Sequence, residues 1–310
     1  MTKPRLGLVI VNWKQSKLTL ETLFSLSSCR LPPSTLLVLV ENGSADGSVE
    51  IFEEYQKTKI SRNFKLILIK SSHNTGFAGG NNLGIKYLLQ KNCQQILLLN
   101  NDTDLHPDSI ALLLKAQEKL GPALLSPLIY FAPGFEFHAD RYQKKDLGKV
   151  IWYAGGQIDW KNCLTSHQGV NEIDSQKYKS PQKTDFASGC CLLLPAKIFK
   201  KIGLFDERYF LYWEDVDLSI RAARAGFPAY LVPTAKIWHK NSGSSQVGGL
   251  LHDYFLTRNR LLFGFKYAPF RTRLSLLKES LKHFFKGRPW QKIAVKDYYL
   301  KNLFQGSWKK

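Results

Sequence analysis

The chain lacks long apolar runs and has few cysteines. Its longest uncharged stretch, residues 120–135, is interrupted by three prolines, whereas a helix needs about 18 apolar residues to cross a bilayer. The N-terminus enters a strand-like run at Leu6 without a signal-peptide pattern. The five cysteines are scattered and include no CxxC pair, which favours reduced thiols without a structural zinc. We therefore expect a globular protein of the cytoplasm.

Acidic residues are also few. The chain has 25 Asp and Glu against 44 Lys and Arg, a net charge of +19. Much of the excess lies between Arg258 and Lys310, which contains 14 basic and two acidic residues, a net charge of +12. The same segment contains eleven aromatic residues. A basic and aromatic segment suits an anionic surface, either a phospholipid leaflet or a nucleic-acid backbone.

The common nucleotide-binding motifs are absent. Residues 12–15, Asn-Trp-Lys-Gln, follow the first strand-like run without a GxGxxG pattern, which disfavours a nicotinamide or flavin fold. A glycine-rich segment at 74–82 lacks the Gly-Lys-Ser/Thr of a P-loop. It predicts a turn between a strand and a helix whose backbone N–H groups approach an anion. The alternative is a loop that needs glycine only for positive φ.

The first half of the chain alternates short apolar runs with amphipathic segments. Strands buried on both faces are predicted at 6–11, 36–40, 66–69 and 96–99. Helices are predicted at 17–28, 48–57, 82–91 and 107–119. This rhythm predicts an α/β fold, a Rossmann-like and mostly parallel sheet flanked by helices.

The second half has a different pattern. Residues 131–184 lose the rhythm and read as an inserted irregular or β segment. Regular structure resumes at 186–194, and helices are predicted at 195–202, at 214–225 and through the basic segment after His239. We expect one domain at 1–248, made of two halves at 1–130 and 131–248, and a helical basic C-terminal extension at 249–310.

Polar residues follow the predicted strands of the first half. They are Asn12; Glu41, Asn42 and Gly43; Asn74, Thr75 and Gly76; and Asn100, Asn101 and Asp102. Ligands of open α/β sheets bind at the carboxyl ends of the strands. These residues are therefore the candidate site.

Two acidic motifs suggest metal-assisted chemistry. Asp102 and Asp104 follow a buried strand, where one or two carboxylates suffice for Mg²⁺ or Mn²⁺ that also binds substrate phosphates. The alternative for Asp104 is capping of the next helix. Glu214 and Asp215 open a predicted helix and are candidates for a general base, although the helix dipole alone also favours acids there. Asp217 cannot share a helix face with Asp215.

His239 and Arg258 are weaker candidates on their own. A lone histidine is more often structural than a metal ligand. Arg258 and Arg260 would suit a pyrophosphate or an acidic acceptor, and the alternative is a solvated basic helix face.

In combination the motifs resemble glycosyltransferase family 2, and within it the rhamnosyltransferase-like and galactofuranosyltransferase-like enzymes. The resemblance covers about residues 6–263. Its motifs are Val-Ile-Val-Asn at 9–12, Glu-Asn-Gly-Ser-Ala-Asp-Gly-Ser at 41–48, the glycine-rich 74–82, Leu-Asn-Asn-Asp-Thr at 99–103, Gly-x-Phe-Asp-Glu at 203–207, Trp-Glu-Asp-x-Asp-Leu at 213–218, and Tyr254 with Asn259.

The resemblance implies a GT-A fold, a nucleotide-diphosphosugar donor, a divalent cation (Mg²⁺ or Mn²⁺) and inversion at the anomeric carbon. Within the expected domain at 1–248, it makes residues 1–130 the nucleotide-sugar-binding half and residues 131–248 the acceptor and catalytic half. Asp102 matches the metal-binding acid, although Asn100 stands where many members have a first Asp. His239 matches the histidine that completes the metal site in galactofuranosyl relatives. Asp215 matches the catalytic base, with Glu214 as its competitor.

The remaining expected donor contacts follow from the same resemblance. Glu41 matches the acid that contacts the nucleotide base, and Asn12 lies near it. Gly76 and Asn81 match the loop beneath the sugar and diphosphate. We also expect contacts to the donor from Asn42, Asn74, Asn100, Asn101 and Arg258.

The sequence therefore predicts an inverting glycosyltransferase at the cytoplasmic face of the membrane, peripheral rather than spanning. Subgroup similarity favours a dTDP-rhamnose donor, with UDP-hexoses or UDP-galactofuranose behind it, and a glycan or polyprenyl-linked acceptor. The rival interpretations are a basic nucleic-acid-binding protein, in which the acidic motifs would line nothing useful, and a sugar nucleotidyltransferase. We expect no nucleic-acid partner.

Overall fold

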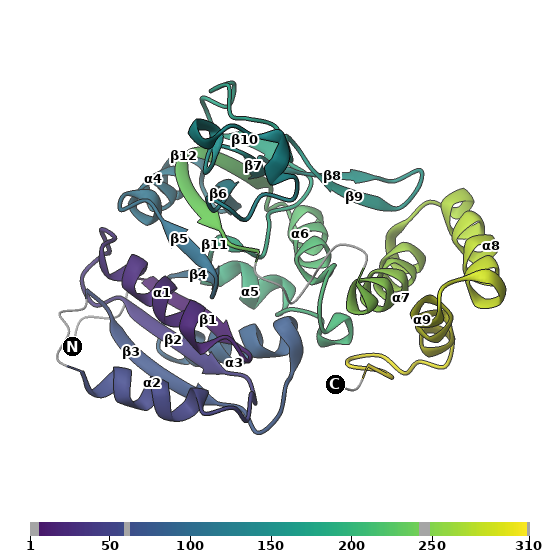
Figure 1. The fold of residues 1–310 in the computed structure, drawn as a ribbon, viewed down its shortest axis with the longest axis horizontal. Helices are drawn as coiled ribbons and strands as arrows, with labels where there is room; N and C mark the ends of the chain where they lie inside the picture. The colour runs from purple at the N-terminus through teal and green to yellow at the C-terminus, as the bar shows by residue number, and fades with distance from the viewer. Residues whose placement is uncertain (1–5, 59–62, 242–248, 309–310) are drawn as a thin grey trace.

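The computed structural model describes residues 6–58, 63–241 and 249–308 (Figure 1). Over these residues the centre of the molecule is a ten-stranded sheet, with the order β10-β12-β6-β11-β4-β1-β2-β3, to which β5 adds beside β12 and β7 beside β6. A separate hairpin joins β8 and β9.

The strands are β1 (Leu6–Asn12), β2 (Leu36–Glu41), β3 (Lys65–Lys70), β4 (Gln95–Asn100), β5 (Thr103–Leu105), β6 (Leu124–Phe131), β7 (Ile151–Tyr153), β8 (Gly156–Asp159), β9 (Leu164–His167), β10 (Gln182–Thr184), β11 (Cys191–Pro195) and β12 (Ala229–His239). The helices are α1 (Ser16–Ser27), α2 (Ser48–Lys57), α3 (Gly76–Gln90), α4 (Ser109–Leu120), α5 (Ala196–Ile202), α6 (Glu214–Arg224), α7 (Leu250–Tyr267), α8 (Phe270–Lys286) and α9 (Pro289–Tyr299). Short 3₁₀ helices are η1 (Ala139–Arg141), η2 (Lys144–Asp146) and η3 (Glu207–Tyr209).

The predicted α/β rhythm of the first half is confirmed. β1 lies between β2 and β4 and is parallel to both, and the two strands beside it end level with it: Asn12 pairs with Glu41, and Val11 with Asn100. On β1, Leu8 and Ile10 pack on the side of α1, α2 and α4, whereas Val9 packs on the side of α3, α5 and α6. Because helices cover both faces, these strands are continuous apolar runs.

Two long strands, β6 at the end of the first half and β12 in the second, were not predicted, and both contain a proline. β6 holds Pro127, and β12 holds Pro233 within a register shift between Val232 and Lys236. β11 runs antiparallel to both β4 and β6, and β12 is parallel to β6. The long strands β3, β2, β1, β4, β6 and β12 therefore all point one way, so the sheet is mostly parallel, as expected.

Residues 131–184 were expected to form either an irregular or a β segment, and the structure shows the strands β7 to β10 there. β7 extends the sheet beside β6, β10 extends it beside β12, and the β8–β9 hairpin projects toward the C-terminal helices (Figure 1). The glycine-rich segment 74–82 was predicted as a turn before a helix that begins at 82. In the structure α3 already begins at Gly76, so most of the segment is helical.

The C-terminal helices α7, α8 and α9 form a group at the side of the molecule remote from β3 (Figure 1). Phe265 on α7 stacks on Tyr298 on α9, with ring centroids 5.6 Å apart. Phe263 on α7 packs against Trp213, 4.8 Å away, so the group is joined to the rest by apolar contact. The expected boundary between the domain and the C-terminal extension, at residue 248, falls in the segment 242–248, which lies outside the described residues. None of the described helices has the length and hydrophobicity to cross a membrane.

Candidate active site

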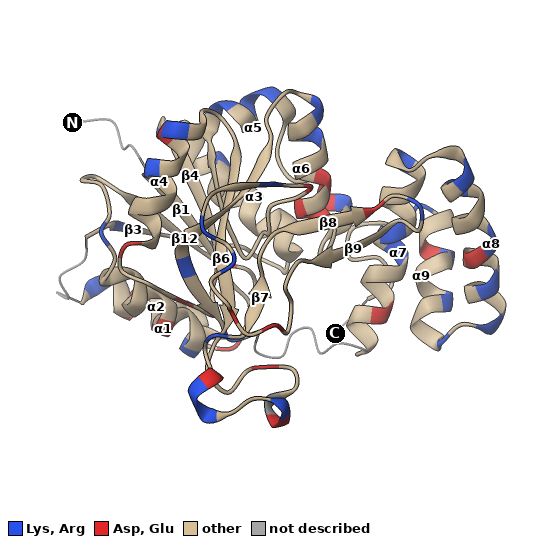
Figure 2. Ribbon diagram, turned by 90° about the horizontal axis from the view of Figure 1, so that it is seen from above, with Lys and Arg blue, Asp and Glu red and all other residues tan. Residues whose placement is uncertain are grey.

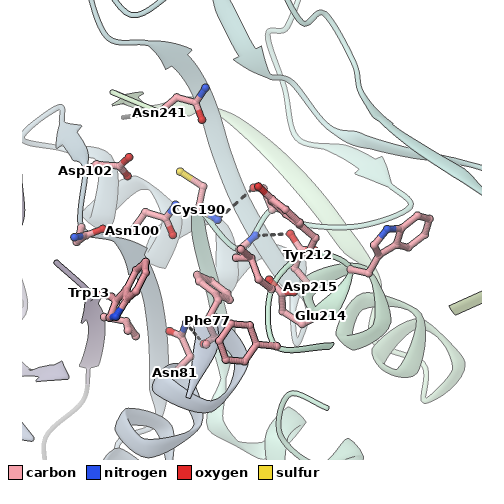
Figure 3. A pocket seen from close by; sticks show the side chains of 18 of the residues that line it. Trp13, Phe77, Asn81, Asn100, Asp102, Cys190, Tyr212, Glu214, Asp215 and Asn241 are labelled. Atoms are coloured by element: carbon pink, nitrogen blue, oxygen red, sulfur yellow. Dashed lines mark hydrogen bonds between the residues drawn. The ribbon is translucent and has the colours of Figure 1, made fainter. Parts of the chain in front are cut away.

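A pocket of about 370 Å³ opens at the sheet edge where β1, β4 and β12 end (Figure 3). Because β12 runs in the same direction as β4, His239 at its last position reaches the edge that carries Asn100. The walls come from the start of α3, the loop before α6, the inserted segment and Trp308 near the C-terminus. The pocket therefore draws on all three predicted parts of the chain.

Most of the residues expected at the site line this pocket. They are Asn42, Asn74, Gly76, Asn81, Asn100, Asn101, Asp102, Glu214, Asp215 and His239. Four expected residues, Asn12, Glu41, Asp104 and Arg258, are not in its lining.

Asp102 and His239 form a close pair on one wall. His239 Nε2 lies 3.0 Å from Asp102 Oδ1, and both side chains are buried. The backbone holds them together: Thr103 and His239 are partners in the β5–β12 ladder, and the Lys240 N–H donates to the Asp102 carbonyl at 2.9 Å. His239 Nδ1 is buried without a hydrogen-bond partner among the described residues.

Asp104, expected as a second metal ligand, lies outside the pocket. Its carboxylate lies 3.4 Å from Lys240 Nζ and is partly exposed. Over the described residues no cluster of three or more His, Cys, Asp or Glu side chains is close enough to hold a metal. Asp102 and His239 remain a candidate pair of ligands, and a pair would suit a cation that takes its other ligands from substrate phosphates and water.

Asp215 and Glu214 lie on the opposite wall, at the first turn of α6. The backbone N–H groups of Gly189 and Val216 donate to the two Asp215 oxygens at 2.9 and 2.8 Å. Asp215 is half-buried at the surface of the pocket, whereas Glu214 is buried, with Oε2 lacking a partner among the described residues. The arrangement leaves the Asp215 carboxylate fixed in direction and facing the cavity (Figure 3).

The two carboxyl groups differ in acidity. Burial and the neighbouring charge of Asp215 raise the pKa of Glu214 well above its usual value. Burial also raises the pKa of Asp215, but the Gly189 and Val216 N–H groups oppose that shift. Of the two carboxyl groups, Asp215 is therefore the one that loses its proton more readily.

Cys190 lies between the two acidic walls. Burial raises the pKa of its thiol well above the usual value, and the negative charges of Asp102 and Asp215 raise it further. Asp102, Cys190 and Asp215 thus line one and the same pocket (Figure 3).

The loop before α6 is strained. Phe210, Tyr212 and Trp213 have φ of 64°, 68° and 74°, in the left-handed region that bulky side chains rarely adopt. Asn259 on α7 donates its amide to the carbonyl oxygens of Tyr209, Leu211 and Tyr212 at 2.8, 2.7 and 2.9 Å. Strained backbone of this kind is typical of functional sites and persists only where the surroundings hold it.

Arg258, expected to bind the donor, has a structural role instead. Its side chain is fully buried, and its guanidinium donates to the carbonyls of Arg208, Tyr209 and Phe304 at 3.0, 2.9 and 2.5 Å. The buried guanidinium thus donates its hydrogen bonds to the loop that Asn259 also holds. A pattern of basic residues cannot distinguish such a carbonyl-binding arginine from one that binds phosphate.

The start of α3 is shaped by a tight contact with the same loop. Gly76 has φ of +71°, and a Cβ added there would lie 2.4 Å from the carbonyl oxygen of Phe210. The Asn42 amide donates to Asn74 Oδ1 and to the Gly76 carbonyl, both at 3.1 Å. The glycine is therefore needed both for its φ and for this close approach.

Glu41 and Asn12 lie outside the pocket lining and bind groups in the neighbouring loops and in α1. Glu41 is buried and accepts hydrogen bonds from the Gly43 and Ser44 N–H groups at 3.1 and 3.0 Å. The Ser44 hydroxyl accepts from the Lys14 N–H at 2.9 Å, which ties the loop after β1 to the loop after β2. Both Glu41 oxygens accept hydrogen bonds within the loop, so the structure shows Glu41 holding the loop, and its contact with a nucleotide base stays a prediction.

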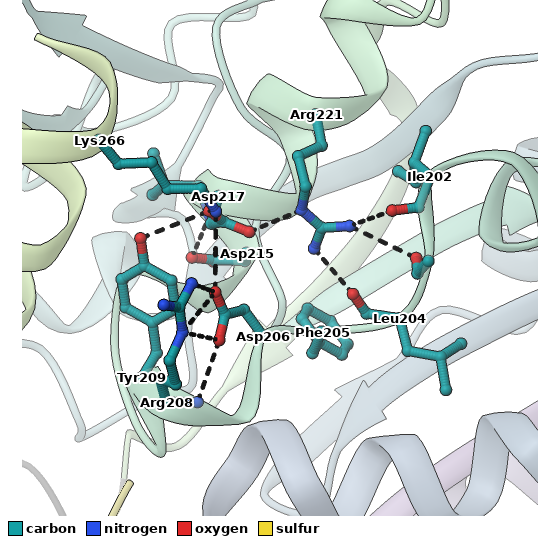
Figure 4. Close-up of polar contacts among 12 residues, drawn as sticks. Ile202, Leu204, Phe205, Asp206, Arg208, Tyr209, Asp215, Asp217, Arg221 and Lys266 are labelled. Atoms are coloured by element: carbon teal, nitrogen blue, oxygen red, sulfur yellow. Dashed lines mark hydrogen bonds and ion pairs between the residues drawn. The ribbon is translucent and has the colours of Figure 1, made fainter. Parts of the chain in front are cut away.

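Asp217 belongs to a structural ion cluster beneath the site (Figure 4). Its fully buried carboxylate binds Arg221 Nε and Lys266 Nζ, each at 2.7 Å. Arg221 also donates to the Ile202 and Leu204 carbonyls. As the helical spacing indicates, Asp217 points away from Asp215 and anchors α6 to α7.

Beside the aromatic pair Tyr212 and Trp213, which precedes Glu214 and was expected to wall a pocket, the lining contains aromatic side chains that were not predicted. Trp13 follows Asn12 directly, so its place after β1 was an available signal. Trp152 and His167 come from the insertion and Trp308 from the C-terminus. Trp152 packs edge-on against both His167 and His239, at 4.5 and 4.7 Å, and burial lowers the pKa of His167 to about 4. No local pattern links such distant positions.

Comparison with known sequences identifies the family. The sequence profile described as Glycosyl transferase family 2 matches residues 8–203. A low-salt glycan biosynthesis hexosyltransferase of Haloferax volcanii is 25% identical over 270 residues, which cover 86% of this chain and 74% of that protein. An N-acetylglucosaminyl-diphospho-decaprenol L-rhamnosyltransferase of Mycobacterium tuberculosis is 28% identical over 232 residues, 72% of each chain. A galactofuranosyltransferase of the same organism is 25% identical over 229 residues, 69% of this chain and 35% of its own length.

The fold has counterparts among solved glycosyltransferases. A mannosyltransferase from Pyrobaculum calidifontis, in complex with GDP-Man and Mn²⁺, superposes with a TM-score of 0.57 at 12% identity, over 97% of this chain and 75% of that one. The likeness at this identity concerns the fold, which is the GT-A type.

Proposed function

The chain belongs to glycosyl transferase family 2, in its rhamnosyltransferase-like and galactofuranosyltransferase-like group, and we propose that it transfers a sugar with inversion of the anomeric carbon. The donor is a nucleotide-diphosphosugar, and the acceptor is a hydroxyl of a glycan or lipid-linked saccharide. The observation that carries the proposal is that Asp102 and His239 line the same pocket as Asp215.

Asp215 is the general base of this reaction. Its ionised carboxylate takes the proton of the acceptor hydroxyl, and the oxygen attacks the anomeric carbon from the face opposite the diphosphate. The bond between that carbon and the diphosphate oxygen breaks, and the diphosphate leaves with the electron pair. The raised pKa of Asp215 makes it a stronger base than an ordinary carboxylate.

Glu214 supports Asp215 by remaining neutral. A second ionised carboxylate beside the first would raise the pKa of Asp215 further and repel the diphosphate. Burial of Glu214 keeps its proton in place and leaves a single negative charge on this wall at the start of the reaction.

Asp102 and His239 would hold a divalent cation, Mg²⁺ or Mn²⁺. Their close pairing and the orphaned His239 Nδ1 suit a pair of ligands that rearranges when a cation and a diphosphate arrive together. When bound, the cation would offset the charge that grows on the leaving diphosphate. Asn100 at the position of a first acid leaves this shell with one carboxylate, so part of the coordination falls to the donor.

The nucleotide would lie along Trp13 and the start of α3. Trp13 presents an aromatic face at the end of β1, and Asn42, Asn74 and Gly76 shape the adjoining wall. Glu41 contributes by fixing the loop after β2. Group membership favours dTDP-rhamnose as donor, with UDP-hexoses or UDP-galactofuranose as the alternatives.

The acceptor would enter on the side formed by the C-terminal residues. Leu251, Leu256 and Trp308 give this side of the pocket an apolar wall, which suits a saccharide carried on a polyprenyl diphosphate. We also propose a peripheral location at the cytoplasmic membrane face, where the basic C-terminal helices meet anionic lipid. A nucleic-acid partner is not proposed, because three carboxyl groups line the pocket.

A donor screen tests the proposal. The full chain is incubated with dTDP-rhamnose, UDP-galactofuranose and UDP-hexoses, with Mg²⁺, with Mn²⁺ and with chelator, and release of the nucleoside diphosphate is measured. We expect turnover of one donor class that depends on the cation. Transfer to a saccharide acceptor, followed by NMR of the anomeric proton, should show inversion. Absence of donor cleavage under every condition, or a product with retained configuration, would contradict the proposal.

A further inference from the structure

The outer face of α8 carries a row of exposed apolar side chains. They are Phe270, Leu274, Leu277, Leu281, Phe284 and Phe285, and we call them the α8 stripe. Phe270 and Phe285, at the two ends, are 74% and 69% exposed. With 3.6 residues per turn, all six lie within about 100° of the helix circumference.

The stripe is distinct from the face by which α8 packs on the protein. Thr272, Leu276 and Ser280 are buried, and the Thr272 hydroxyl donates to the Trp160 carbonyl at 2.9 Å. The Ser280 hydroxyl lies 2.8 Å from the Tyr299 hydroxyl of α9. A surface helix normally turns polar residues outward once its inner face is buried. The outer face of α8 is instead apolar, which indicates that a partner covers the α8 stripe.

Basic residues border the stripe. Arg271, Lys278 and Lys282 follow one edge of it and Arg273 the other, by helical position. None of these four is in an ion pair among the described residues, and the one acid of α8, Glu279, is turned to Arg260. Figure 2 shows Lys and Arg along the outer side of α8 and α9.

We propose that the α8 stripe inserts into the interface of an anionic phospholipid bilayer, with its basic border on the lipid phosphates. An apolar face with Lys and Arg at its edges is the pattern of helices that lie in a membrane interface. This inference rests on the membrane contact proposed above and names the surface that makes it.

A second copy of the chain is a poorer occupant of the stripe. Two α8 helices packed stripe to stripe would bring the Lys278 and Lys282 borders of both copies together, where like charges repel. Anionic headgroups instead attract the basic residues of that border. Charge complementarity therefore favours lipid.

Point variants of the full chain test the stripe better than truncation does. Removal of residues 271–310 would also remove Trp308, which lines the pocket and stacks on Tyr254. We choose Phe270→Ser with Phe285→Ser for the stripe, and Lys278→Gln with Lys282→Gln for its border. The controls are Phe24→Ser with Leu164→Ser, two exposed apolar residues outside α8 (51% and 48%), and Lys115→Gln with Lys119→Gln on α4.

Flotation with phosphatidylglycerol-containing vesicles, compared with phosphatidylcholine alone, gives the readout. We expect the wild type to bind the anionic vesicles, less so at high salt. Each stripe or border variant should lower the partition coefficient by about tenfold or more, and the controls should leave it unchanged. Donor cleavage in solution should be the same in all five proteins, since the stripe does not line the pocket.

Three results would overturn the inference. Stripe variants that bind like the wild type would show that another surface carries the contact. Equal binding to neutral vesicles would remove the role of the basic border. A dimer in sedimentation that the Phe270→Ser, Phe285→Ser variant abolishes would assign the stripe to a second copy. A wild type that cleaves no donor but binds vesicles as predicted would instead refute the proposed function and leave the stripe standing.

Discussion

The side-chain amide of Asn259 lies 2.9 Å from the carbonyl oxygen of Tyr212, two residues before Glu214 and three before Asp215. The same amide also donates to the carbonyls of Tyr209 and Leu211. One residue of α7 thus holds a backbone with positive φ at Phe210, Tyr212 and Trp213. We infer that Asn259 is a positioning residue, which sets where α6 begins and hence where Asp215 points.

Replacement of Asn259 by Ala should disturb catalysis more than donor binding. Loss of the donors leaves buried carbonyls unpaired, at a cost to the free energy of folding of about 1–3 kcal/mol. We expect kcat to fall by about tenfold or more through misplacement of Asp215, with the donor Kd measured by calorimetry nearly unchanged. Arg260→Gln, one position along α7 and facing Glu279 instead of the loop, is the control. An Asn259→Ala enzyme that loses stability but keeps kcat would reduce Asn259 to a structural role.

Gly76→Ala should impair the donor wall through a steric clash. The new Cβ would lie 2.4 Å from the Phe210 carbonyl, in addition to the strain of a positive φ. Gly121→Ala is a matched control, because Gly121 has φ of +75° with no atom within 4 Å of its added Cβ. Both should lose about 1 kcal/mol of stability from φ alone. Only Gly76→Ala should also weaken donor binding in calorimetry, and equal donor affinity in the two variants would contradict the account.

Glu214→Gln should stabilise the protein at neutral pH. The raised pKa of Glu214 means that the folded state binds this proton more tightly than the unfolded chain does. Wild-type stability therefore falls as the pH rises above the unfolded value of about 4.3, and the neutral amide of Gln removes that loss. The Tm of the variant should exceed that of the wild type at neutral pH, with the difference vanishing at about pH 4.

The same variant separates the two carboxyl groups in catalysis. Since Glu214 is neutral in the working enzyme, Glu214→Gln should keep transfer within a small factor of the wild-type rate. Glu50→Gln, on the exposed first turn of α2, should change neither Tm nor rate. Loss of transfer in Glu214→Gln without loss of folding would make Glu214 the base.

His239→Ala should raise the cation concentration needed for activity. Removal of one of two protein ligands should move the midpoint of a Mn²⁺ titration of donor cleavage upward by about tenfold or more. Asp104→Asn is the control, because Asp104 pairs with Lys240 outside the pocket. A midpoint that stays where it is in His239→Ala would return the histidine to a structural role, packed against Trp152.

The parts of the fold that follow from local pattern were predictable. Continuous apolar runs identified β1 to β4, because strands covered by helices on both faces have no polar side. β6 and β12 escaped prediction because Pro127 and Pro233 interrupt their patterns. In β12 the register shift absorbs the irregularity, and the strand still delivers His239 to the pocket.

The place of the candidate residues was predictable where a local motif marks them. Motifs single out Asp102 after β4 and Asp215 at the start of α6, the family resemblance adds His239, and all three line one pocket. Arg258 was misjudged because its burial and its carbonyl partners depend on the loop at 208–213, which is distant in sequence. Trp152, His167 and Trp308 reach the pocket only through tertiary packing, and no local signal marks them.

The central claim is that Asp215 takes the acceptor proton in the pocket that Asp102 and His239 share. The most direct test is the transfer rate of Asp215→Asn, measured with the donor Kd in the same preparation. The amide is nearly isosteric but cannot accept the proton, so we predict a fall in rate of about 10²–10⁴-fold with donor affinity retained. A variant that transfers sugar at a rate close to the wild type would contradict the account.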